Sequence, residues 1–352
     1  MGYYFLYTTH IYRIEGKKVK VIVDAMGGDN APHAIVEGCI AGLKENKKLS
    51  VTLVGKQDAV EAELNKYDYD KSRVSVVNAT QTIEMAEPAV DAIRKKKDSS
   101  MVVAMKLLKE SPQSVFITAG STGATVAGST LIVRRIKGVK RPALAALVPT
   151  KKEKMLVLDV GANSDCRPSF LAQFALMGSI YMQKVEGVKN PRVGLVSNGS
   201  EDEKGNELTK AAFKLIQKMP VDFKGNTEAR ELMSGDYEVM VADGFTGNVV
   251  IKFLEGLAGA LMFMLKGELK KSLRTKIGAA LAIPAFRGFK KNMDYKEYGG
   301  ALLLGINGGI LKAHGSSDAT AIKSTLGQAA HFIEGDVIEV IKNEILKIKI
   351  ED

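Results

Sequence analysis

Several common classes of protein are excluded by what this sequence lacks. Its 352 residues include only two cysteines and four histidines, so neither a disulfide framework nor a paired set of metal ligands is predicted. No run of 18 or more uncharged apolar residues occurs, and no membrane-spanning helix is expected. The G-x-G-x-x-G spacing of a dinucleotide site and the G-x-x-x-x-G-K-[ST] spacing of a P-loop are also missing. We therefore expect a chain that works in the reducing cytoplasm without a metal or another cofactor.

Charge is unbalanced toward the basic side, with 50 Lys and Arg residues against 40 Asp and Glu residues and a formal net charge of +10. Such a balance favours an acidic partner, which can be nucleic acid, an anionic membrane surface or an acidic protein. Aromatic residues make up only 6% of the chain, and neither zinc-finger spacing nor an aromatic RNA-binding cluster occurs. Nucleic acid is therefore the least favoured partner, and we expect none.

Five glycine-rich turns are the most informative feature that the sequence does contain. Each follows an apolar run typical of a buried strand and precedes a run typical of a helix. A turn of this kind presents free backbone N–H groups and the positive end of a helix dipole, which suits a phosphate group. The turns are MGGDNAP (26–32), AGSTGAT (119–125), DVGANSD (159–165), SNGSEDEKGNE (197–207) and ADGFTGN (242–248).

The order of these runs predicts an α/β fold. Apolar runs alternate with helical patterns and short turns, which favours a mostly parallel sheet covered by helices on both faces. Ligands of such sheets bind at the carboxyl ends of the strands, so the five turns are expected to line one crevice. We expect residues 19–352 to form one domain and residues 1–18 to be a leader that is disordered or foreign to the native chain. The predicted strands are 19–25, 51–55, 74–79, 114–120, 155–161, 192–199 and 237–244.

Six blocks of sequence connect the chain to a known family. They are VDAMGGDNAP (23–32), AGSTGA (119–124), DVGAN (159–163), SEDEKGNELTK (200–210), DGFTGNVVIK (243–252) and AHGSSDA (313–319). Together, and in this order, they resemble the PlsX family of bacterial phosphate acyltransferases. The resemblance runs from about Lys20 to the last predicted helix, and only the leader lies outside it.

This resemblance implies a Rossmann-like three-layer α/β/α fold similar to that of the phosphotransacetylases, and a homodimer. The implied reaction transfers a fatty acyl group from the thioester of acyl carrier protein (acyl-ACP) to inorganic phosphate, giving acyl phosphate for phospholipid synthesis. The resemblance also implies peripheral association with the inner face of the cell membrane. A membrane acyltransferase that consumes acyl phosphate is a further implied partner.

The implied chemistry needs few catalytic groups, because a thioester is already activated. A phosphate oxygen can attack it directly, without an acyl-enzyme, if the dianion is held in line and the tetrahedral oxyanion is stabilised. The resemblance places Lys204 in the active site, to neutralise phosphate or help the thiolate leave, although a loop lysine is often only exposed. Asn248 is expected to donate to the oxyanion, or else to cap a helix. His314 could protonate the thiolate or be structural.

Further residues of the turns are expected to bind phosphate or to shape its site. Asp24, Asp29 and Asn30 should order the first turn, and Asp159 and Asn163 should hold neighbouring loops together. The second turn resembles an anion-binding nest, although its hydroxyls could equally cap the following helix. The candidate set is Asp24, Gly27, Gly28, Asp29, Asn30, Gly120, Ser121, Thr122, Gly123, Asp159, Gly161, Asn163, Asn206, Asp243, Gly244, Thr246 and Gly247.

The segment 257–291 departs from the α/β pattern and is predicted to form a basic amphipathic helical extension. From Lys266 to Lys291 it holds eight Lys and Arg residues against one acidic residue, Glu268. Such a segment can lie on an anionic bilayer, grip an acidic carrier protein, or pack as a pair of dimer helices. The family's membrane association favours the bilayer. The expected contact residues are Leu261, Phe263, Lys270, Lys271, Phe286 and Phe289.

Two alternatives to this function remain open. A phosphotransacetylase that uses acyl-CoA would share the chemistry and the turns. A non-catalytic basic scaffold would tether an acidic partner to a membrane, but it would have no use for five turns suited to phosphate.

Overall fold

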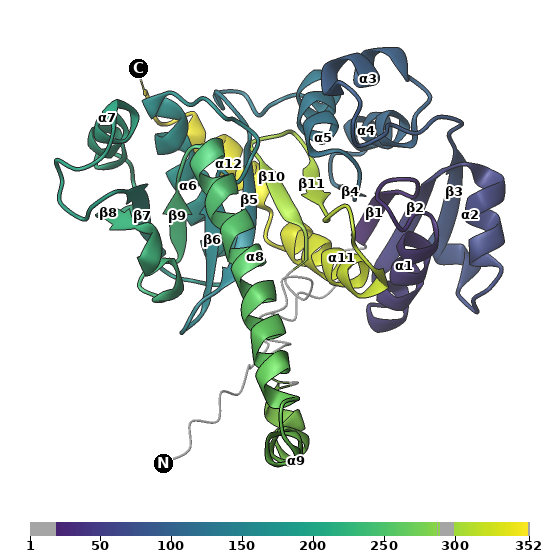
Figure 1. Cartoon of the computed structure of the whole chain (residues 1–352). Coiled ribbons are helices and arrows are strands. Elements are labelled where there is room, and N and C mark those ends of the chain that lie inside the picture. The colour runs from purple at the N-terminus through teal and green to yellow at the C-terminus, as the bar shows by residue number, and fades with distance from the viewer. Residues whose placement is uncertain (1–18, 287, 289–298, 351–352) are drawn as a thin grey trace.

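The computed structural model describes residues 19–286, 288 and 299–350, so the predicted leader 1–18 and Phe289 lie outside the described residues. One sheet of eleven strands runs through this part of the chain, in the order β3-β2-β1-β4-β11-β10-β5-β6-β9-β7-β8. Helices cover both of its faces (Figure 1). The expected three-layer α/β/α architecture with a mostly parallel sheet is therefore confirmed.

The sheet consists of two parallel halves joined by two antiparallel strands. The first half contains β3 (Val74–Asn78), β2 (Leu49–Gly55), β1 (Val19–Asp24), β4 (Val115–Thr118) and β11 (Gly309–Lys312). The second half contains β6 (Lys154–Leu158), β9 (Val239–Val241), β7 (Arg192–Ser197) and β8 (Asp222–Glu228). Between them lie β10 (Ala301–Leu304) and β5 (Ala143–Pro149), each antiparallel to both neighbours. Three antiparallel pairings thus separate the halves, whose strands run in opposite directions.

The register of the joining strands brings the carboxyl ends of both halves to the same level of the sheet. Ala145 of β5 pairs with Leu158, the last residue of β6, and also with Leu302 of β10. Ala301, the neighbouring residue of β10, pairs with Lys312, the last residue of β11. The last residue of β4 pairs with that lysine in turn. The turns that follow these strands therefore meet at the middle of the sheet, although the strands approach it from opposite sides.

Alternate residues of each strand face two different hydrophobic cores. Val21 and Val23 of β1 lie in one core and Ile22 in the other, and Ile117 and Phe116 of β4 are divided in the same way. The first core lies under α1 (His33–Glu45), α2 (Gln57–Leu64), α6 (Pro168–Lys184), α7 (Glu207–Ile216), α11 (Ala319–Glu334) and α12 (Val337–Ile345). The second core lies under α3 (Ala89–Lys95), α4 (Ser100–Glu110), α5 (Thr122–Gly128) and the first turns of α8 (Gly244–Leu269).

All seven predicted strands are present, and four strands were missed. The missed strands are β5, β8, β10 and β11, three of which form the centre of the sheet. β10 and β11 have four residues each, which is too short for a visible alternation. β5 reads ALAALVP, and alanine is a weak strand former. The pairing of β5, β10 and β11 at the centre of the sheet could therefore not be predicted from the local sequence pattern.

The helical extension differs from its prediction in where it begins and in how apolar it is. α8 begins at Gly244 rather than near Leu257, and it projects away from the sheet with α9 (Leu273–Leu281) at its far end (Figure 1). Over 18 residues of α8 the mean hydropathy reaches 1.6 with none of that window buried, so its length and composition would allow it to cross a membrane. The sequence search for uncharged runs missed it because Lys252 and Glu255 interrupt the apolar residues.

The start of α8 is fixed against the turn that follows β6. The Asp243 carboxylate caps the helix by accepting hydrogen bonds from the backbone N–H groups of Phe245 and Thr246, at 3.1 and 2.9 Å. A Cβ atom at Gly247 would overlap the Asp159 carbonyl oxygen, and one at Gly244 would lie 2.5 Å from the Asn163 carbonyl oxygen. Both positions therefore require glycine for the helix backbone to reach the turn.

We expect Gly247→Ala to lower the free energy of unfolding by about 1–3 kcal/mol, the usual cost of forcing extra atoms into a packed contact. Gly256 lies in the same helix, and no atom lies within 4 Å of a Cβ built there. Gly256→Ala is therefore the matched control, and its higher helix propensity should leave stability unchanged or raise it by up to about 1 kcal/mol. Denaturant titrations measure both values. Equal stabilities of the two variants would show that α8 does not dock on this turn.

Candidate functional site

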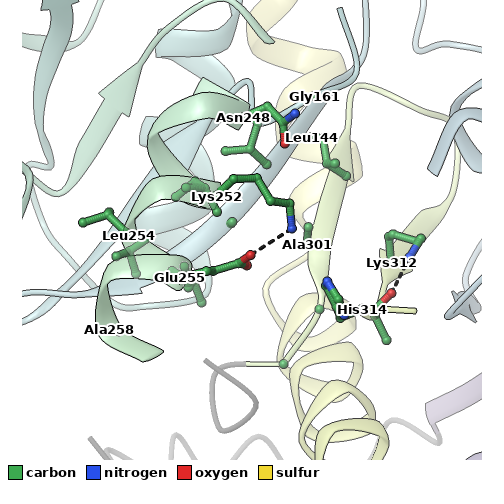
Figure 2. A pocket seen from close by; sticks show the side chains of 18 of the residues that line it. Leu144, Gly161, Asn248, Lys252, Leu254, Glu255, Ala258, Ala301, Lys312 and His314 are labelled. Atoms are coloured by element: carbon green, nitrogen blue, oxygen red, sulfur yellow. Dashed lines mark hydrogen bonds and ion pairs between the residues drawn. The ribbon is translucent and has the colours of Figure 1, made fainter. Parts of the chain in front are cut away.

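A cavity of about 600 Å³ lies where the carboxyl ends of the two half-sheets meet. Its lining comes from the turns after β4 and β6, from β5, from the adjoining ends of β10 and β11, and from one side of α8 (Figure 2). Three of the five glycine-rich turns contribute, at Thr122, Gly161 and Asn248. The prediction of one crevice lined by all five is wrong in this respect, because the turns 26–32 and 197–207 do not line the cavity.

A buried carboxylate, Asp159, shapes the turn after β6. Its Oδ1 accepts hydrogen bonds from the backbone N–H groups of Leu144, Gly161 and Ala162 at 3.0, 3.1 and 2.9 Å. Its Oδ2 accepts from the backbone and side-chain N–H groups of Asn163 at 2.8 and 2.7 Å. Burial raises the pKa of Asp159, and these hydrogen bonds oppose that rise. One side chain thus ties the turn to β5 and sets the position of Gly161 in the cavity wall.

Asp24 has the same role at the end of β1. The Thr118 hydroxyl donates to its Oδ2 at 2.8 Å and the Met26 backbone N–H donates to its Oδ1 at 3.2 Å. A Cβ at Gly27 would lie 2.7 Å from that Oδ2 and 2.8 Å from the Gly120 nitrogen, so the turns after β1 and β4 are in direct contact. Burial raises the pKa of Asp24.

The turn after β1 also holds the 313–319 block. The Asp29 backbone N–H donates to the Gly315 carbonyl at 2.8 Å, and a Cβ at Gly28 would lie 2.8 Å from the same oxygen. Asn30 Nδ2 donates to the carbonyls of Ser316 and Ser317 at 3.3 and 3.1 Å. These residues do not line the cavity, but they hold the segment that carries His314.

The polar end of the cavity combines an amide, an imidazole and two ammonium groups. They belong to Asn248, His314, Lys252 and Lys312 (Figure 2). Asn248 lies opposite Gly161, where a Cβ would be 3.8 Å from its side-chain oxygen. Asp243 caps the N-terminus of α8, so the alternative role of Asn248 as the helix cap does not apply.

His314 lines the cavity but stays exposed to solvent, and it has a defined tautomer when it is neutral. Its Nδ1 accepts a hydrogen bond from the Ser316 backbone N–H at 3.3 Å and lies 2.9 Å from the Ser316 hydroxyl oxygen. With Nδ1 as acceptor, the ring proton is on Nε2. Burial first, and the positive charge of Lys252 second, lower the pKa of His314 below its ordinary value of 6.5. The ring is therefore neutral at pH 7 and acts as a hydrogen-bond donor rather than as a strong acid.

The two lysines of the polar end have different surroundings. Lys252 Nζ forms an ion pair with Glu255 Oε2 at 2.8 Å, three residues along α8, and 54% of its side chain is exposed (Figure 2). Lys312 is buried, and burial lowers its pKa to about 8. The two positive charges act on the same end of the cavity, because Lys252 is a further cause of the lowered pKa of Lys312.

Apolar side chains line the rest of the cavity between β5 and α8. They belong to Ala146, Leu147, Val148, Pro149, Met233, Ile251, Leu254, Ala258 and Met262. An apolar channel that ends at convergent polar groups is the usual form of a site for an amphiphilic small molecule. It can hold a hydrophobic chain while the donors at its end contact a reactive head.

Other predicted site residues lie outside the cavity lining. Lys204 is exposed, in the turn after β7. The side chains of Ser121, Asn206 and Asp243 cap α5, α7 and α8. Thr246 donates its hydroxyl to Asp243 Oδ2 at 2.7 Å. Gly120 and Gly123 lie beside Thr122 in the second turn without lining the cavity. The catalytic role of Lys204 stays a prediction.

Sequence reasoning missed Lys252, Glu255 and Lys312. Lys252 ends the DGFTGNVVIK block, four residues after Asn248, and this spacing places both side chains on one face of a helix. Lys312 directly precedes the AHGSSDA block. The sequence therefore indicated these two lysines only by their position at the edge of a family block.

Neither a metal nor a cysteine nucleophile is indicated by this geometry. Within the described residues, no three His, Cys, Asp or Glu side chains are grouped so that they could hold a metal ion. Burial raises the pKa of the Cys166 thiol to about 12, which leaves almost no thiolate at neutral pH. Cys166 is therefore poorly suited to act as a nucleophile.

Comparison with known proteins identifies the relatives of the chain. Residues 19–340 match the family described as "Fatty acid synthesis protein". Phosphate acyltransferases of Clostridium novyi and Clostridium beijerinckii are 48% and 49% identical to the chain, each over 93% of its length and 98% of theirs.

Solved structures support the fold. A phosphotransacetylase from Streptococcus pyogenes has a TM-score of 0.59 at 17% identity, over 92% of this chain and 95% of its own. The EutD phosphotransacetylase from Staphylococcus aureus has a TM-score of 0.57 at 17% identity, over 89% and 94%. The expected similarity to the phosphotransacetylase fold is thus confirmed.

Proposed function

The chain belongs to the fatty acid synthesis protein family, and from that premise we propose that it transfers a fatty acyl group from the thioester of acyl-ACP to inorganic phosphate. The product is acyl phosphate, and free ACP leaves as its thiol. The relatives carry the name phosphate acyltransferase, which supports the acceptor and the class of reaction. The acyl donor is our inference.

The observation that carries this proposal is the form of the cavity. Its apolar walls from β5 and α8 suit a fatty acyl chain, and its polar end gathers Asn248, Lys312 and His314. A thioester carbonyl at the boundary between these regions would lie beside the donors, with its acyl chain buried. Burial of the chain would contribute about 0.8 kcal/mol for each CH₂ group removed from water.

The reaction can proceed by direct attack. A phosphate oxygen forms a bond to the thioester carbonyl carbon, and the carbonyl π electrons move to oxygen to give a tetrahedral oxyanion. The Asn248 amide donates a hydrogen bond to this oxyanion. When the intermediate collapses, the C–S bond breaks and its electron pair leaves on sulfur. The Nε2–H of neutral His314 donates a hydrogen bond to the thiolate, which then takes a proton from solvent.

An acyl-CoA donor is the second candidate, and the fold favours it as much as it favours acyl-ACP. The polar end and the apolar walls would serve either thioester, because both donors present the same acyl group. The net charge of +10 suits either donor, because an acidic carrier protein and the phosphate groups of CoA are both anionic. A non-catalytic scaffold would leave the cavity and its donors without a role.

We further propose that the enzyme works at the inner face of the cell membrane, as a homodimer. Apolar side chains along α8 and α9 are exposed, including Leu261 at 53%, Phe263 at 79% and Leu281 at 80%. Exposed apolar groups at this density mark a surface that another phase or protein covers. Lys270 and Lys271 lie between the two helices and would contact anionic headgroups. Phe286 is half-buried and belongs to the same extension.

The donor is tested by incubating the purified chain with long-chain acyl-ACP and measuring free ACP with and without phosphate. We expect release that depends on phosphate and continues in EDTA. The same assay with acyl-CoA should be slower. Equal or faster release of CoA would replace the ACP proposal with the CoA alternative, and release without phosphate would indicate a thioesterase.

Substitution of Asn248 tests the oxyanion donor. Asn248→Asp keeps the shape but removes the N–H donors, so the turnover number should fall by about 10²-fold or more, the effect of removing one preorganised donor. Lys204→Ala should cause a similar fall if this lysine acts as its sequence position predicts. His314→Ala should cause a smaller fall. Near-normal turnover in any of these variants, with an unchanged melting temperature, would remove that residue from the mechanism.

Charge reversal of the extension tests the membrane face. Lys270→Glu with Lys271→Glu should weaken binding to vesicles that contain anionic lipid by more than about 2 kcal/mol, because each lost basic residue contributes about 1 kcal/mol and the new carboxylates are repelled by the lipid. Phe263→Ser should also weaken it, whereas Leu131→Ser, which changes an exposed apolar residue on the body, is the matched control. Vesicle sedimentation measures binding. Unchanged sedimentation together with loss of the dimer would make the extension an assembly element instead.

A further inference from the structure

Lys312 is a buried lysine at the cavity without an assigned role. It is the last residue of β11, and the alternation along that strand places its side chain on the same face as Ile310, in the layer that α8 covers. Only 8% of the residue is exposed, and it lines the polar end of the cavity.

The contacts of its ammonium group orient it but leave it unsaturated. Lys312 Nζ donates a hydrogen bond to the backbone carbonyl of Ala313 at 2.5 Å (Figure 2). It donates a second one to the backbone carbonyl of Ala119 at 3.5 Å. An ammonium group has three N–H donors. Two neutral carbonyls therefore hold the group in place while one donor remains for a ligand in the cavity.

The charges around Lys312 do not neutralise it. Across residues 19–286, 288 and 299–350, no carboxylate lies within ion-pair distance of its Nζ. Lys252 on α8 adds positive charge, and Asp24 and Asp29, from β1 and the turn after it, act only through space as smaller influences. His314, on the same segment, is neutral at pH 7. Glu255 also lines the cavity, but its carboxylate is held in the ion pair with Lys252. Lys312 is therefore a cation of the cavity lining to which no carboxylate of the described residues is directly paired.

We propose that Lys312 binds the phosphate dianion that attacks the thioester, through its remaining N–H and its charge. This inference rests on the function proposed above. A buried ammonium without a counter-ion is costly, and a bound dianion would supply the missing negative charge. The dianion would in turn favour the charged form of the lysine.

The other lysines near the site fit this role less well. Lys252 is already paired with Glu255 and more than half of its side chain is exposed. Lys204, to which the sequence assigns phosphate charge, does not line the cavity. Lys312 alone among these three combines burial, a place in the lining and the absence of a paired carboxylate.

The test uses the full chain with inorganic phosphate as the probe and measures two quantities. One is the phosphate concentration for half-maximal rate, and the other is the rise in melting temperature that phosphate causes. Lys312→Met has a similar volume and no charge. It should raise the half-maximal concentration by about 10- to 100-fold, the effect of losing one charge-assisted hydrogen bond, and should reduce the rise in melting temperature at any fixed phosphate concentration. Lys66→Met, which removes a lysine from a distant exposed ion pair, should change neither quantity.

A pH series on the wild-type chain tests the proposal even if Lys312→Met does not fold. The ammonium is charged below its pKa, which is about 8, and neutral above it. Affinity for the phosphate dianion, calculated from the dianion concentration at each pH, should therefore be constant below this value and fall as the pH rises through about 8. Lys312→Arg keeps its charge at these pH values and should retain phosphate affinity at higher pH. A wild-type affinity that does not change across this range would overturn the proposal.

The outcomes separate this inference from the proposed function. If Lys312→Met folds and keeps the wild-type response to phosphate, the inference is wrong, while phosphate-dependent release of ACP would still support the function. The opposite result is that the wild-type chain transfers no acyl group but is stabilised by phosphate, and that the Lys312→Met variant lacks this stabilisation. The phosphate site is then supported and the proposed function fails.

Discussion

The register of β5 and β10 is the constraint on which the site depends. Three antiparallel pairings reverse the second half of the sheet, so its carboxyl ends would lie far from those of the first half in most registers. A shift of two residues would move one set by about 7 Å relative to the other. A shift of one residue would exchange Leu144 with Ala143 and Ala145 between the two cores. Burial on both faces thus fixes the level at which the turns meet.

Two buried carboxylates, Asp159 and Asp24, fix the turns at the strand ends that the register brings together. Strand ends that meet inside a protein leave backbone N–H groups without partners, and such groups are costly to bury. Asp159 satisfies four of these with one side chain, and Asp24 performs a similar task beside Thr118. Both carboxylates are surrounded by donors, so their negative charge is already engaged near a site proposed for an anion. The cavity itself is left to Asn248, His314 and Lys312.

The sequence predicted the features that depend on local pattern and missed those that depend on pairing over long distances. The three layers, seven strands and the turns could be predicted because apolar runs and the Gly, Asp and Asn residues that end them are local features of the sequence. Asn248 and His314, which belong to the family blocks, line the cavity, and their roles stay predictions. β10 and β11 are short, and their pairing with β4 and β5 joins segments far apart in the chain. Lys312 could not be identified as buried before that pairing was known.

α8 connects the site to its surroundings through two faces of one rigid element. Ile251, Leu254, Ala258 and Met262 recur every three or four residues and face the cavity. Phe253 lies outside that row and is 67% exposed. Apolar side chains nearer the end of the helix, such as Leu261 and Phe263, are also exposed. A surface or protein that covers the exposed face of α8 would therefore contact the same helix that forms a wall of the cavity. Asn248 lies on the same helix, next to Gly247, which docks the helix on the turn after β6, so this one helix joins the exposed apolar surface to the polar end of the cavity.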